Sequence, residues 1–226
     1  MNLSYKHLSY CLLAAFTTLA EAAELSVEII SPSGKPVGNA VITLTPHKNI
    51  KLPDDKIHII DQINKTYVPH VKIIPVGSKV SFPNKDNIQH HVYSFSDAKK
   101  FELPLYEGTP TNPVTFNKPG IVALGCNIHD WMLGYVYVTD DPWFAVSDAQ
   151  GKLNLEQLPA GTYTASLWHP QAPDMLPQAA GQVQLTEAGS KQRFTLTMQA
   201  PASQATPSAP ASAFGDAFKK ARDAAQ

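Results

Sequence analysis

Charged residues are scarce in this sequence, and they are not clustered. Asp, Glu, Lys and Arg make up 16% of the 226 residues, and the formal net charge is -1. Binding of a phosphate backbone requires clustered Lys and Arg, so nucleic acid is not an expected partner. The sequence also lacks a paired-carboxylate, Ser-His-Asp or phosphate-loop signature, and it therefore does not predict an enzyme.

Apolar runs long enough to cross a bilayer are lacking as well. The run at the N-terminus, residues 8–20, is shorter than the ~20 residues that a membrane helix needs. It follows Lys6 and His7 and precedes the small-x-small sequence Ala20-Glu21-Ala22. This order is typical of a secretory signal peptide over residues 1–22. We therefore expect an exported, periplasmic protein with no membrane span in its mature chain.

Cysteine is nearly absent. Cys11 lies in the predicted leader, which leaves Cys126 alone in the exported chain. Oxidising compartments normally contain paired cysteines, so a lone thiol requires an explanation. It is a buried inert residue, a bridge between two chains, or a metal ligand.

Proline and glycine, in contrast, are frequent. The 19 prolines and 12 glycines divide the chain into short apolar segments such as "VKIIP", "HHVYSFS" and "GYVYV". Alternating segments at this spacing predict an all-β protein with a Greek-key sandwich or barrel. In "HHVYSFS" we expect Val92 and Phe95 to lie in the core. Residues 200–226 are rich in Ala, Ser and Pro and predict a disordered tail.

Two segments resemble carboxypeptidase-regulatory-like β-sandwich modules. They are "GKPVGNAVITL" and "SDAQGKLNLEQLPAGTYTASLWHP", and about ninety residues separate them here. The resemblance implies that residues 24–50 and 142–199 form one sandwich, into which a second domain, residues 51–141, is inserted. Two sequential domains are the alternative.

Three soft donors lie within seven residues of "GCNIHDWM". Cys126, His129 and Met132 offer a thiolate, an imidazole and a thioether, a mixture that suits copper when a second imidazole is present. His90 or His91 in "FPNKDNIQHHVYSFS" provides that imidazole. A buried inert thiol and a methionine that fills the core are the alternatives.

These two segments resemble the cupredoxin family. The Cys-x2-His-x2-Met spacing is similar to the short ligand loop of amicyanin-type members, and the whole pattern resembles plastocyanin-like proteins of methylamine utilisation. The resemblance implies one type 1 copper site with the ligands His90, Cys126, His129 and Met132. The family usually has Asn at position 91, so His91 is an alternative ligand. Strand alternation favours His90, because it shares a face with Val92.

The resemblance also implies a function. We expect single-electron transfer to or from a periplasmic redox protein, with Trp131 and Met132 in an apolar docking surface around His129. Asn84, Asp86 or Asn87 is expected to link the two ligand loops by hydrogen bonds. The alternatives are a copper-binding or copper-delivery protein without redox cycling, and a β-sandwich interaction module with a vestigial metal site.

Overall fold

The computed structural model describes residues 23–47 and 56–199. The predicted signal peptide and the predicted tail lie outside these residues, so both stay predictions. The described residues form seventeen strands and one short 3-10 helix, Pro173–Met175, which confirms the all-β prediction. No helix in this part of the chain has the length and apolar character needed to cross a membrane.

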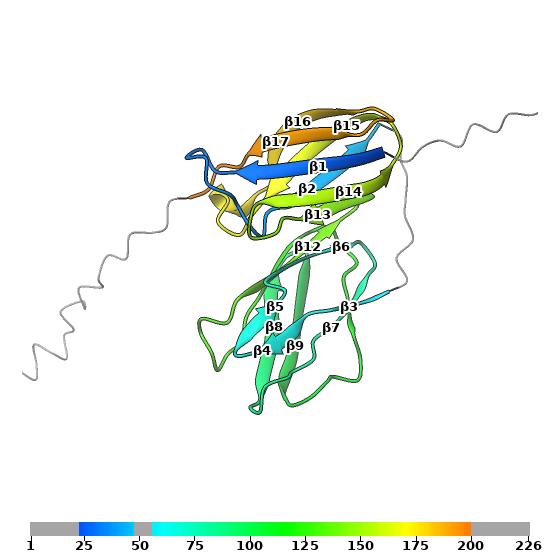
Figure 1. The fold of residues 1–226 in the computed structure, drawn as a ribbon. Coiled ribbons are helices and arrows are strands. Elements are labelled where there is room, and N and C mark those ends of the chain that lie inside the picture. Colours follow the sequence, from blue (N-terminus) through cyan, green and yellow to red (C-terminus); the bar gives the residue numbers. More distant parts are fainter. Residues whose placement is uncertain (1–22, 48–55, 200–226) are drawn as a thin grey trace, which may run out of the picture.

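One β-sandwich consists of strands from both ends of the described chain (Figure 1). Its first sheet has the order β14-β1-β17, and its second has the order β13-β2-β15-β16. The strands are β1 (Ala23–Ile30), β2 (Val41–Pro46), β13 (Trp143–Val146), β14 (Lys152–Leu158), β15 (Gly161–Trp168), β16 (Gln178–Leu185) and β17 (Ser190–Thr195).

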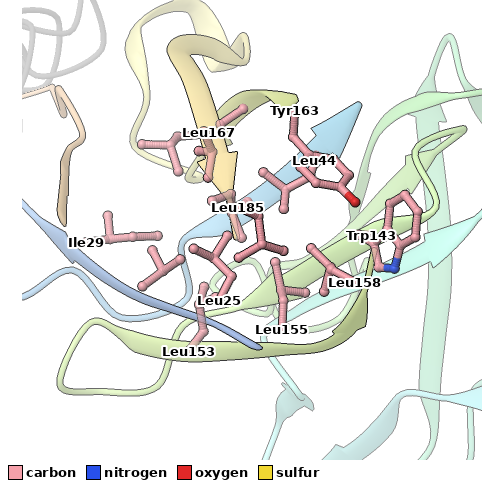
Figure 2. Packing of buried hydrophobic residues seen from close by; sticks show 14 of the residues in the cluster. Leu25, Ile29, Leu44, Trp143, Leu153, Leu155, Leu158, Tyr163, Leu167 and Leu185 are labelled. Carbon is pink, nitrogen blue, oxygen red and sulfur yellow. The ribbon is translucent and has the colours of Figure 1, made fainter. Parts of the chain in front are cut away.

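The core of this sandwich follows from alternation along its strands. In β1, Leu25, Val27 and Ile29 are buried, whereas the residues between them are exposed or half-buried. Figure 2 shows leucines of both sheets, among them Leu25 of β1 and Leu185 of β16, pointing toward one another between the layers. Alternation of this kind places one face of β1 between the two sheets.

The remaining strands form a second sandwich (Figure 1). Its small sheets have the orders β10-β7-β3, β11-β12-β6, β4-β5 and β8-β9. The strands are β3 (Ile57–Ile59), β4 (Asp61–Ile63), β5 (Thr66–Val68), β6 (Val71–Pro75), β7 (Lys79–Ser81), β8 (His90–Ser96), β9 (Lys99–Tyr106), β10 (Val114–Thr115), β11 (Gly120–Leu124) and β12 (Gly134–Thr139).

The chain therefore leaves the first sandwich after β2 and returns to it at β13. Each sandwich has its own buried core, and a further cluster of buried residues joins the two. Trp168 of β15 is fully buried and lies edge-on to the rings of Tyr135 and Tyr137 in β12, with centroids 5.8 and 5.6 Å away. Val41 of β2 and Ile73 of β6 belong to the same cluster. The outer face of β12 and β6 is thus covered by the first sandwich.

One expectation about the core is wrong. Phe95 is 79% exposed, whereas Val92 is fully buried. The two residues are three positions apart in β8, and side chains at odd separation along a strand point to opposite faces. Phe95 therefore lies on the outer face, where its ring is 5.2 Å from that of Tyr93.

Candidate metal centre

Strand β11 directs the thiol of Cys126 into the second sandwich. Val122 and Leu124 point inward and are at most 1% exposed, and Cys126 follows in the same phase at 3%. Gly125 continues the pairing beyond the strand, because its N–H donates to the carbonyl of Tyr93 at 3.0 Å. The sequence thus places Cys126 at the end of the core rather than at the surface.

Two histidines approach the Cys126 thiol from different segments. Nδ1 of His90, at the start of β8, lies 3.8 Å from Sγ, and Nδ1 of His129 lies 3.7 Å from it. The ligand atoms of the three residues all lie within 4.8 Å of one another. No other group of three such donors occurs at residues 23–47 or 56–199.

The turn that carries His129 is closed by backbone hydrogen bonds. The His129 N–H donates to the Cys126 carbonyl at 3.4 Å, and the Met132 N–H donates to the His129 carbonyl at 2.9 Å. Successive turns of three residues bring His129 and Met132 back toward the end of the core. Met132 is 1% exposed and belongs to the same buried cluster as Cys126.

A carboxylate holds the far nitrogen of His90. Nε2 of His90 lies 2.8 Å from Oδ2 of Asp86, whose oxygens also accept the backbone N–H groups of Asn64 and Lys65 at 2.6 and 2.9 Å. Burial acts to raise the pKa of Asp86, but the hydrogen bonds from Lys65, His90 and Asn64 outweigh it and lower the pKa overall. A carboxylate in this position fixes the ring of a metal-binding histidine and increases its basicity.

Asn84 organises the segment that leads to His90. Its Nδ2 donates to the carbonyls of Ile88 at 2.7 Å and Tyr106 at 3.0 Å, and its Oδ1 accepts the Asp86 N–H at 3.0 Å. The bonds of Asn84 and Asp86 therefore run to the end of β9 and to the turn at residues 64 and 65. The loop that carries Cys126 receives none of them.

His91 faces away from the cluster. Its Nε2 lies 2.8 Å from Oε1 of Glu102, and its ring centroid is 5.5 Å from that of Tyr93. His91 is nevertheless 5% exposed and is therefore buried on the opposite side of β8. Of the two adjacent histidines, His90 is the one placed beside the thiol.

The surface above His129 is apolar, although Met132 contributes little to it. Trp131 is 68% exposed and its ring lies edge-on to that of His129, with centroids 5.6 Å apart. Ile128 and Leu133 are also exposed. The expectation that Met132 forms part of an exposed surface is wrong, because its side chain packs into the core.

The donor set fits copper. Burial lowers the pKa of His129, and the neighbouring His90 adds to this effect. A lowered pKa favours the neutral imidazole, the form that binds metals. Two imidazoles and one thiolate lie close together here, and the buried thioether of Met132 belongs to the same hydrophobic cluster as Cys126. These are the ligand types of a blue-copper centre.

No family model and no curated protein matches the sequence. Among solved structures, a reduced amicyanin variant is 20% identical, with a TM-score of 0.34 over 43% of this chain and 99% of that chain. A purple cupredoxin from Nitrosopumilus maritimus is 27% identical, with a TM-score of 0.32 over 36% and 96%. A copper-containing nitrite reductase from Thermus scotoductus SA-01 is 22% identical, with a TM-score of 0.36 over 50% and 28%.

The β-sandwich and its donor set define the class of protein. The second sandwich is a cupredoxin-like domain. It consists of small β-sheets and contains one buried thiol and two imidazoles whose ligand atoms lie within 4.8 Å of one another. His90, Cys126 and His129 form one group of donors, and their types fit a single copper ion. The first sandwich is an additional β domain beside it.

Proposed function

We propose that this chain is a periplasmic type 1 copper protein that carries single electrons to or from a redox protein. The observation that supports this most strongly is the convergence of His90, Cys126 and His129, with all ligand atoms within 4.8 Å. Copper bound there would supply a one-electron couple between Cu(I) and Cu(II). Met132, which is buried in the same hydrophobic cluster as Cys126, would offer its thioether as a further ligand.

The protein's contribution is to hold the donors in place before and after each transfer. His90 is fully buried and bonded to Asp86, and Cys126 is buried at the end of β11. Donors fixed by packing and hydrogen bonds change position little when the charge of the site changes. Small rearrangement suits a carrier whose task is repeated, reversible electron transfer.

Electrons would enter and leave near His129. This ligand is 8% exposed, whereas His90 is fully buried. Ile128, Trp131 and Leu133 are close to His129 in sequence and are exposed, so they would offer the partner an apolar surface. Exposed apolar patches rimmed by polar residues mark interaction sites, and redox encounters use small ones.

The domain division belongs to the same proposal. Residues 51–141 would form the copper domain, inserted into a sandwich of residues 24–50 and 142–199. Support comes from the order of the strands, since β3 to β12 lie between two groups of strands that share sheets. The leader at residues 1–22 would direct the protein to the periplasm, and the mature chain would act as a carrier rather than as an enzyme.

A visible spectrum tests the function. Residues 23–226 are purified, loaded with Cu(II) and compared with the Cys126→Ala variant. We expect an intense thiolate-to-copper band at about 600 nm, typical of His2Cys ligation, which the variant lacks. Reversible reduction and reoxidation of this band by a small one-electron reagent would support the carrier function.

The other outcomes are equally informative. A colourless protein that binds Cu(I) and forms no such band with Cu(II) would indicate copper delivery or storage. If the protein binds neither Cu(I) nor Cu(II), the proposed copper site is wrong. The two β-sandwiches would then be interaction modules.

A further inference from the structure

Two glycines enclose the copper-binding loop. The ligand segment Cys126 to Met132 is preceded by Gly125 and followed, after Leu133, by Gly134, the first residue of β12. The segment contains no proline that would stiffen it. Its two ends pair with one another where Leu124 of β11 lies opposite Gly134 of β12, and contacts with other parts of the chain add to this pairing.

Tyr67 of β5 contacts both ends. Its hydroxyl donates to the Gly125 carbonyl at 2.9 Å, in the peptide group that leads into Cys126. Its ring lies directly over Gly134, where a methyl group would come within 2.9 Å of Cγ and Cδ2 of Tyr67 and within 2.8 Å of its Cβ. Tyr67 is 2% exposed, so both contacts are buried.

Tyr93 of β8 supports the first of these ends from the other side. Its backbone exchanges two hydrogen bonds with Gly125, at 3.1 and 3.0 Å. Its ring covers the glycine so closely that a methyl group there would lie 2.7 Å from Cζ. The Gly125 carbonyl thus accepts both the Tyr93 N–H and the Tyr67 hydroxyl, which uses both of its lone pairs.

We propose that Tyr67 is a positioning residue that fixes both ends of the copper-binding loop. It reaches no ligand atom, and it acts through the peptide of Gly125 and the backbone of Gly134. This inference rests on the proposed function, since it concerns the geometry of that same site. The buried phenol replaces the stiffness that the loop sequence itself does not supply.

The consequence concerns the metal-free protein as well as the loaded one. If Tyr67 holds the loop, Cys126 and His129 stay close to their binding positions when no metal is present. A preorganised site binds more tightly, because less conformational freedom is lost on binding. Loss of the hydroxyl removes one of the three hydrogen bonds to Gly125 and should loosen that end of the loop, while the ring still covers Gly134.

The experiment compares Tyr67→Phe with Tyr163→Phe. Tyr163 is a matched control, because it is 3% exposed and its hydroxyl donates to the Pro159 carbonyl at 2.5 Å in the other sandwich. Each protein is examined for copper affinity by competition with a chelator, and for amide exchange of residues 126–133 without metal. Removal of groups beyond the direct ligands typically weakens metal binding about 10- to 100-fold, and we expect about tenfold for Tyr67→Phe.

We also expect at least tenfold faster amide exchange of the loop in metal-free Tyr67→Phe, and wild-type behaviour of Tyr163→Phe in both measurements. Gly134→Ala serves as a second variant, because the added methyl group would clash with Cβ, Cγ and Cδ2 of Tyr67 and displace the whole side chain, and it should also speed the exchange of the loop. Unchanged affinity and unchanged exchange in Tyr67→Phe would overturn the proposal. Equal changes in both tyrosine variants would also overturn it, since they would reflect general stability.

Failure of the proposed function gives a different result. In that case the wild-type protein lacks the band at about 600 nm expected of His2Cys ligation. The exchange measurement still decides the role of Tyr67, because it is made without metal.

Discussion

His90 and His91 are neighbours in sequence but occupy opposite faces of β8. The side chain of His90 reaches Cys126 and is held from behind by Asp86, whereas His91 is paired with Glu102. The alternation of a strand therefore decides which imidazole can serve a metal. That choice could be argued from the sequence, because Val92 is an evident core residue and shares its face with His90.

Substitution of each histidine tests this difference. We expect His90→Ala to abolish the thiolate-to-copper band, because the site loses one of its two imidazoles. His91→Ala should retain the band, although loss of a buried residue lowers stability. Visible spectra of the two copper-loaded variants provide the measurement. A colourless His91→Ala variant beside a blue His90→Ala variant would reverse the assignment.

Asp86 tunes His90 through a single hydrogen bond. We expect Asp86→Asn to weaken Cu(II) binding about tenfold, because the negative charge that stabilises the imidazole bound to a cation is lost. Cu(I) carries less charge and should be affected less. The reduction potential should therefore rise by up to about 59 mV, the value for a tenfold loss of Cu(II) affinity with an unchanged Cu(I) affinity in a one-electron couple. Cyclic voltammetry measures the potential.

The control for this prediction is Asp97→Asn. This substitution removes the same negative charge from the copper domain, but the side chain of Asp97 is 90% exposed. Its substitution should leave the potential within a few millivolts, since exposed charges are screened. Equal shifts in both variants would indicate a long-range charge effect instead of a specific bond.

At the level of elements, the phase of β11 sets the position of the thiol. Val122, Leu124 and Cys126 share the inner face of β11. The packing of this strand into the core therefore also determines where the thiol of Cys126 lies. The sequence predicted the strand after the loop, where "GYVYV" alternates aromatic and β-branched residues. It did not predict β9, whose exposed and half-buried residues give no clear apolar pattern. It also misplaced Phe95, although strict alternation from Val92 excludes that residue from the core.

Truncation of Leu124 tests the importance of β11. We expect Leu124→Ala to lower the free energy of unfolding by about 2–5 kcal/mol, the usual cost of a cavity in a packed core. Leu105→Ala is the control, because Leu105 is 49% exposed and should cost less than about 0.5 kcal/mol. Urea unfolding of the metal-free proteins measures both. A similar, small effect of both substitutions would show that β11 tolerates loss of packing.

At the scale of the whole molecule, the sequence could predict two β-sandwiches with one inserted into the other, but not how the two pack together. Resemblance to known modules identified each part, and the aromatic residues of "GYVYV" and "ASLWHP" carried no sign that they meet. The structure brings them together around Trp168, which contacts the outer face of β12. β12 begins directly after the copper-binding loop. The first sandwich therefore supports the strand into which the loop leads.

Trp168 should consequently couple the unfolding of the two sandwiches. We expect one calorimetric transition for the metal-free wild-type protein, because a buried aromatic cluster spans both parts. Trp168→Ala should lower the free energy of unfolding by about 3–5 kcal/mol, and it should separate this transition into two. Trp143→Ala is the matched control, since Trp143 packs against Tyr163 inside the first sandwich, with ring centroids 5.4 Å apart. It should lower the melting temperature without separating the transition. Two transitions in the wild-type protein would show that the cluster around Trp168 does not couple the sandwiches.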